Sequence, residues 1–201
     1  MKKSLDTRRM VTLAMLSAIL LIMSFTPLGY LNIGPLAISL NMIPVAIGAI
    51  TLGPAGGAFL GALFGITSFL QCIGIGGTSA MGVILFEINP VLAFVQRFVP
   101  RLFAGLLSGL VYVGMKKWTN PTAAGFTTGF CAALLNTVLF MTALVLCFGQ
   151  SDYLQGLIGG QNVILFMCSF VGVNAVVEMF AVTAVVGVVG RVLNKVVFTR
   201  R

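Results

Sequence analysis

Long apolar segments separated by short polar breaks run along almost the whole chain. A membrane-spanning helix needs about 20 mostly apolar residues, and six segments of suitable length lie between the breaks. They cover residues about 9–27, 35–52, 54–72, 90–116, 121–148 and 162–196. The pattern predicts an all-α integral membrane bundle of six transmembrane helices, which forms a single domain over residues 1–201.

The composition agrees with a membrane protein. Hydrophobic residues make up 59% of the chain and charged residues only 8%, whereas soluble domains are about a quarter charged. The net charge of +8 does not indicate binding to nucleic acid, because the cations lie at the ends of apolar segments and not on one exposed face.

The distribution of the cations predicts the orientation. Ten of the twelve Lys and Arg residues lie in the two terminal tails or at Lys116 and Lys117, and the connections at about 28–34, 73–89 and 149–161 hold none. Cytoplasmic loops of membrane proteins carry an excess of Lys and Arg. We therefore expect both termini to be cytoplasmic in a multi-pass protein of a prokaryotic plasma membrane.

Two patterns within the segments predict local structure. Asn41 and Pro44 interrupt the second segment, and Pro44 should kink it. Such a segment is either an ordinary kinked span or a mobile element that gates a site. Glycine recurs at every fourth position from Gly53 to Gly65, and a stripe of this kind lets helix backbones approach closely in lipid.

Groups that carry catalytic chemistry are scarce. Histidine is absent, and the four cysteines and four acidic residues lack metal-ligand or catalytic spacing. The stretch from Gly74 to Gly77 is not followed by the Lys-Ser/Thr of a nucleotide-binding loop. The sequence therefore predicts neither an enzyme nor a protein with a cofactor, a metal ion or ATP hydrolysis of its own.

Two arginines inside an apolar segment are the strongest pointer to function. Arg97 and Arg101 are four residues apart and share one helix face, roughly 10–17 Å from the Pro90 end of the segment. Because a lipid-facing arginine would cost at least a few kcal/mol there, both should face the bundle interior. Glu178 or Glu87 could pair with them, and so could an anionic substrate, since a guanidinium can donate two parallel hydrogen bonds to a carboxylate.

Other polar side chains could complete a pocket around these arginines. Small-molecule sites are mostly apolar with a few placed polar groups, and Phe86, Phe94 and Phe98 could supply apolar walls. Each polar residue taken alone is more often a helix cap or an interhelical hydrogen bond. The candidates are Tyr30, Asn32, Gln71, Asn89, Gln96, Asn136, Asn174 and Glu178.

Ala14 and Ala18 form an Ala-x-x-x-Ala step early in the first segment. This step either packs within the bundle or forms a docking groove for a partner helix, and the residues alone leave both interpretations open.

Three stretches carry a resemblance to a known family. They are Ile33–Pro54, with Asn41 and Pro44 inside it, the Gly-Ala-Phe-Leu-Gly-Ala-Leu-Phe-Gly run that ends at Gly65, and the Val-Pro-Arg-Leu-Phe-Ala-Gly run that ends at Gly105. Together with six expected spans, they resemble the substrate-binding S component of energy-coupling factor (ECF) vitamin transporters over residues 8–195. The sequence looks most like the pantothenate-type members.

The resemblance implies a function and partners. Family members bind a vitamin or its precursor with high affinity near the outer surface, and then associate with a membrane coupling subunit and two ATPase subunits. Ala14 and Ala18 match the family's contact with the coupling subunit. Two deep arginines favour an anionic vitamin such as pantothenate. The alternatives are folate, riboflavin, hydroxymethyl pyrimidine, or a standalone secondary transporter.

Overall fold

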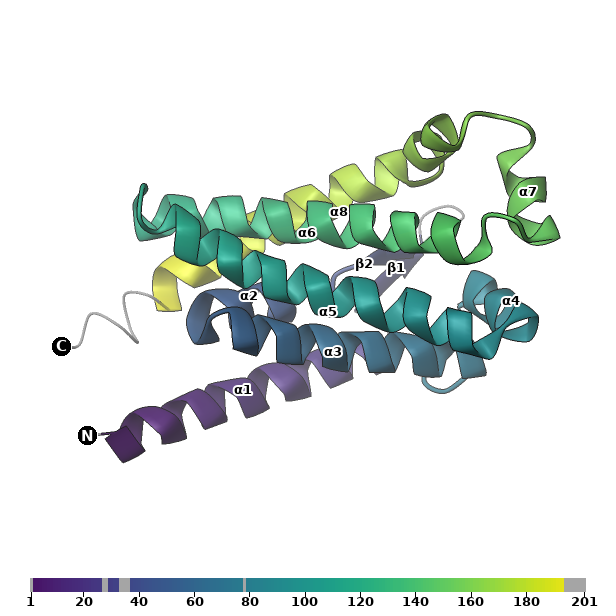
Figure 1. Cartoon of the computed structure of the whole chain (residues 1–201). Coiled ribbons are helices and arrows are strands. Elements are labelled where there is room, and N and C mark those ends of the chain that lie inside the picture. Colours follow the sequence, from purple (N-terminus) through teal and green to yellow (C-terminus); the bar gives the residue numbers. More distant parts are fainter. Residues whose placement is uncertain (1, 27–28, 33–36, 78, 194–201) are drawn as a thin grey trace.

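The computed structural model describes residues 2–26, 29–32, 37–77 and 79–193 (Figure 1). Five of its helices are long and apolar enough to cross a membrane, and a sixth apolar helix, α2, is shorter. The elements are α1 (Lys2–Phe25), β1 (Tyr30–Asn32), β2 (Ala37–Ser39), α2 (Met42–Leu52), α3 (Pro54–Leu70), the 3-10 helix η2 (Gln71–Ile73), α4 (Ala80–Ile88), α5 (Pro90–Met115), α6 (Pro121–Phe148), α7 (Asp152–Ile158) and α8 (Val163–Leu193). The described residues thus form a helical bundle with one short hairpin.

The segment expected as a span over residues 35–52 is not one continuous helix. Strand β2 pairs antiparallel with β1, and α2 begins only at Met42. Pro44 therefore lies in the first turn, where its missing N–H costs no helical hydrogen bond, and the predicted kink at Pro44 is wrong. With 11 residues, α2 rises about 16 Å, roughly half of the hydrocarbon thickness of a bilayer.

Exposed charged residues of opposite sign lie at the two ends of the bundle. Helix α1 begins, α5 turns into α6, and α8 finishes at one end, whereas α4 and α7 lie at the opposite end (Figure 1). We call the first the basic end, because exposed cations gather there: Arg8, Arg9, Lys116, Lys117 and Arg191. The opposite end carries the exposed acids Glu87 and Asp152.

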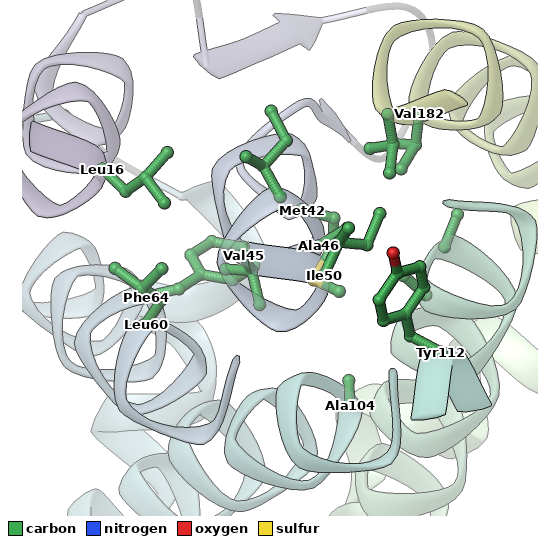
Figure 2. Close-up of a cluster of buried hydrophobic side chains, with 14 of the residues drawn as sticks. Leu16, Met42, Val45, Ala46, Ile50, Leu60, Phe64, Ala104, Tyr112 and Val182 are labelled. Atoms are coloured by element: carbon green, nitrogen blue, oxygen red, sulfur yellow. The ribbon is translucent and has the colours of Figure 1, made fainter. Parts of the chain in front are cut away.

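The short helix α2 is the centre of the bundle. It contacts α1, α3, α5, α6 and α8, and Figure 2 shows its side chains surrounded by those of neighbouring helices. A helix that is apolar on all sides is stable only when it is buried on all sides. The resulting large apolar cluster consists of Leu16, Leu20, Met42, Val45, Ala46, Ile47, Ile50, Leu60, Phe64, Ala104, Tyr112, Ala124, Ala132, Ala133, Val182 and Val186.

The glycine stripe of α3 packs directly on the backbone of α5. A Cβ atom added to Gly57 would overlap the carbonyl oxygen of Gly105, and one added to Gly61 would overlap the carbonyl oxygen of Arg101. The packing role that the sequence predicts for this stripe is therefore confirmed. Because the two backbones touch at Arg101, this contact also fixes where the arginines of α5 lie.

Candidate functional site

A layer of buried polar groups separates two apolar regions of the bundle. The large apolar cluster fills the half toward the basic end, and a small apolar cluster lies near α4 and α7, with Ala93 of α5 and Met141 of α6 among its members. Buried polar groups inside a membrane protein are costly and indicate function. We name seven buried polar residues, which lie on β2, at the start of α2 and on α5, α6 and α8, the polar layer: Ser39, Asn41, Gln96, Arg97, Arg101, Asn136 and Glu178.

Arg101 is held by groups of the protein itself. Its side chain is 5% exposed, and its Cζ atom lies 4.6 Å from the ring centroid of Phe64 and 4.9 Å from that of Phe140. Its Nη1 donates a hydrogen bond of 2.8 Å to the carbonyl oxygen of Arg97, and its charge interacts with that of Glu178. Arg101 is therefore oriented by groups of the bundle itself.

Glu178 ties three elements to this arginine. Its Oε1 accepts a hydrogen bond of 3.1 Å from Asn136 Nδ2 on α6, and the backbone N–H of Ser39 at the end of β2 also donates to its carboxylate. The acid expected from the sequence as a partner thus faces Arg101, and it links α6, α8 and the hairpin.

Arg97 lies in a different environment from Arg101. Its side chain is 6% exposed, and its guanidinium donates to the hydroxyls of Ser68 at 3.5 Å and Ser79 at 3.2 Å. Among the residues that the structure describes, no carboxylate forms an ion pair with Arg97, and Glu87 is exposed on α4. A buried cation whose partners are neutral hydroxyls can accept an anion, because an uncompensated buried charge is unfavourable.

Several other polar atoms of the layer also lack partners. Within the described part of the chain, neither the oxygen nor the nitrogen of the Asn41 and Gln96 amides has a hydrogen bond, and Asn136 Oδ1 and Arg97 Nε are likewise unbonded. Each buried polar group without a partner costs about 1–3 kcal/mol. Chemically, the layer offers one cation and several neutral donors and acceptors to a small anionic molecule.

The remaining candidates have other positions. Gln71 donates from Nε2 to the carbonyl oxygen of Ser24 on α1 at 2.7 Å, and Asn89 caps α5 by accepting from the backbone N–H groups of its first turn. Tyr30 and Asn32 lie in β1, but their side chains lie outside the described part of the chain. Asn174 is buried one helical turn from Glu178 on α8.

The aromatic residues near the guanidinium groups differ from those expected. Phe94 stacks on Phe98 with ring centroids 5.2 Å apart, and Phe86 packs against Phe69. The rings over the arginines are instead Phe64 and Phe140. Sequence reasoning missed these two rings, together with Ser39, Asn41 and Ser68, as members of the site.

The outer surfaces of α1, α6 and α8 are apolar. Ala14 and Ala18 are exposed on α1, so the bundle itself does not cover them. A groove of about 250 Å³ between α6 and α8 is lined by Phe130, Val176, Met179, Phe180 and Thr183. This groove offers almost no polar partner to an anion and faces outward, so it does not extend the polar layer.

Apolar helices of membrane-spanning length around a layer of buried charges define a multi-pass transport protein of the cell membrane. Residues 8–190 match the family model described as ECF transporter, substrate-specific component. The chain belongs to this family, and the resemblance seen in the sequence is confirmed. Membership makes the chain a substrate-specific vitamin transporter subunit and points to a transporter rather than an enzyme, and it implies a partner module of coupling and ATPase subunits.

Two relatives have printed names that agree on a substrate. The chain is 29% identical to the pantothenate transporter PanT of Leuconostoc mesenteroides subsp. mesenteroides over 198 residues, which is 93% of this chain and 92% of the relative. It is 31% identical to the pantothenic acid transporter PanT of Lactococcus lactis subsp. cremoris over 178 residues, which is 81% of this chain and 87% of the relative.

Proposed function

We propose that this chain is the pantothenate-binding subunit of an ATP-driven vitamin importer. The observation that carries the proposal is Arg97, a buried guanidinium whose partners are the neutral hydroxyls of Ser68 and Ser79. Pantothenate supplies the missing anion through its carboxylate, and its amide and hydroxyl groups match the neutral polar atoms of the layer. The names of the two relatives favour the same vitamin.

The proposed orientation places the basic end in the cytoplasm. The exposed cations gather at this end and the exposed acids at the other, as expected for cytoplasmic and outer loops. In a six-span arrangement, α2 crosses the inner half of the membrane and the hairpin of β1 and β2 completes the outer half. The polar layer is then reached from outside.

Within the proposed site, the residues divide into two roles. Arg97 binds the carboxylate, while Arg101, Glu178 and Asn136 hold one another and the hairpin in place around it. Gln96 and Asn174 belong to the walls of the site. Tyr30 and Asn32 remain candidates for its cover, because their backbone lies in the hairpin.

Replacement of Arg97 tests the proposed function. Arg97→Ala should weaken pantothenate binding on the order of 100-fold, because removing one partner of a buried charge pair costs several kcal/mol. Isothermal calorimetry on purified protein measures this effect. Arg191→Ala, which removes an exposed arginine at the basic end of α8, is the matched control and should leave affinity unchanged. Normal pantothenate binding by folded Arg97→Ala protein would contradict the proposal.

The exposed face of α1 is the proposed docking surface for the coupling subunit. Ala18→Trp should leave pantothenate affinity unchanged but abolish ATP-driven uptake into proteoliposomes that contain the complete module, because a bulky side chain separates helices that meet through small residues. Ala18→Ser is the control and should retain uptake. Uptake by this chain alone, driven by an ion gradient, would instead favour a secondary transporter.

A further inference from the structure

We infer that Asn41 and Gln96 form an uncharged subsite that hydrogen-bonds the hydroxyl groups of the bound vitamin. This inference rests on the proposed function, since it concerns the part of the ligand that Arg97 does not reach. It explains why two amides remain without partners in a bundle whose apolar regions are otherwise closely packed.

The position of Asn41 makes its lack of partners informative. Its side chain is 0% exposed, and neither Oδ1 nor Nδ2 forms a hydrogen bond with any residue that the structure describes. Asn41 occupies the N-cap position of α2 but makes no side-chain cap, whereas Asn89 at the same position of α5 accepts from two backbone N–H groups. The amide of Asn41 therefore does not perform the structural role that favours asparagine at this position.

Gln96 presents a second unused amide on a neighbouring helix. It is 0% exposed, and its Oε1 and Nε2 have no hydrogen-bond partners among residues 2–26, 29–32, 37–77 and 79–193. It directly precedes Arg97 in the chain, and Pro100 one turn later has no N–H to donate to the Gln96 carbonyl oxygen. Donors and acceptors are thus concentrated beside the cation that binds the carboxylate.

The N-terminus of α2 adds to the same region. Helix α2 runs from the polar layer toward the basic end, so the positive end of its dipole lies at the layer. An electron-rich hydroxyl oxygen is favoured there, and an amide can both donate to and accept from a hydroxyl. Leucine and methionine resemble asparagine and glutamine in shape. If these two side chains served packing alone, leucine and methionine would be less destabilising, because they bury no polar group without a partner.

The decisive experiment measures the stability of the empty protein and its affinity for pantothenate in Asn41→Leu and Gln96→Met. We expect the melting temperature of each empty variant to rise by about 2–4 °C, because a buried polar group without a partner is removed. We expect pantothenate affinity to fall roughly 10-fold or more, because the hydroxyls lose their partner. A lower melting temperature with unchanged affinity would show a structural role and overturn the inference.

A hydroxyl-free analogue identifies which part of the ligand the amides of Asn41 and Gln96 contact. N-(3,3-Dimethylbutanoyl)-β-alanine keeps the carbon skeleton, the carboxylate and the amide of pantothenate but lacks its two hydroxyls. Wild-type protein should prefer pantothenate, and Asn41→Leu should lose most of this preference. An undiminished preference in both amide variants would overturn the inference.

A matched control and a distinct failure pattern complete the test. Thr67→Val removes a buried hydroxyl that does have partners, Ser24 Oγ at 3.1 Å and the Phe64 carbonyl oxygen, so it should lower the melting temperature and leave affinity unchanged. If wild-type protein does not bind pantothenate at all, the proposed function is contradicted, and the inference that rests on it is rejected as well.

Discussion

The two flanks of helix α5 serve opposite purposes. On the flank that faces α3, the glycine stripe brings the two backbones into contact, and Gly61 meets the carbonyl oxygen of Arg101. Toward the polar layer, the side chains of Gln96 and Arg97 keep polar atoms without hydrogen-bond partners among the described residues, although the Arg97 guanidinium also reaches Ser68 of α3. A rigid backbone contact between α3 and α5 holds the polar binding groups of α5 in place. This reduces the conformational freedom that these groups would lose on ligand binding.

The largest expected effect comes from breaking the rigid flank. Gly61→Leu places a side chain where the Arg101 carbonyl oxygen lies, and backbone cannot move aside as a flexible side chain can. We expect loss of the folded protein, or a fall in melting temperature of more than about 10 °C. Thermal unfolding measures this effect, and Gly114→Leu, on α5 with open space around it, is the control. A native melting temperature for Gly61→Leu would refute the rigid contact.

An intermediate effect on the melting temperature is expected from replacing Glu178, the acid that interacts with Arg101. Glu178→Gln removes the buried carboxylate that accepts from Asn136 and interacts with the charge of Arg101, which should lower the melting temperature of the empty protein by about 5 °C or more. Added pantothenate should raise the melting temperature by more than it does in wild-type protein, because the ligand carboxylate at Arg97, one helical turn from Arg101, offsets part of the lost negative charge. Asp152→Asn, at an exposed acid on α7, should change neither value. Equal ligand-induced shifts in Glu178→Gln and wild type would argue against this electrostatic coupling.

The smallest expected effect concerns the hydroxyl partners of Arg97. Ser68 Oγ lies 3.5 Å from Arg97 Nη1, which is long for a hydrogen bond and therefore weak. Ser68→Ala should change pantothenate affinity by no more than about threefold, measured by calorimetry. A loss as large as that expected for Arg97→Ala would mean that the Ser68 hydroxyl, and not the guanidinium, is the main contact.

Much of the helical framework could be predicted from the sequence, because apolar length and proline positions are local signals. The burial of Arg97 and Arg101 also followed from their position inside an apolar segment, whereas their partner was left open between Glu178, Glu87 and an anionic substrate. These inferences depend on the cost of placing charge in lipid, which does not require knowledge of the tertiary structure.

The parts that could not be predicted depend on tertiary contacts. Strand β2 was assigned to a span and β1 to the preceding loop, since a short apolar run looks the same in the sequence whether it is strand or helix. Asn41 appeared only as an interruption of that span. Phe140 has no local feature that distinguishes it from the other 15 phenylalanines, and Glu87 was a plausible partner until α4 placed it at the surface.

The half-length helix α2 has a consequence for the resting membrane. The side chains around it form a continuous hydrocarbon plug about 16 Å deep between the polar layer and the basic end. Hydrated ions cannot cross such a region without losing their water, which is prohibitively costly. An empty subunit can therefore reside in the bilayer without dissipating the cell's ion gradients.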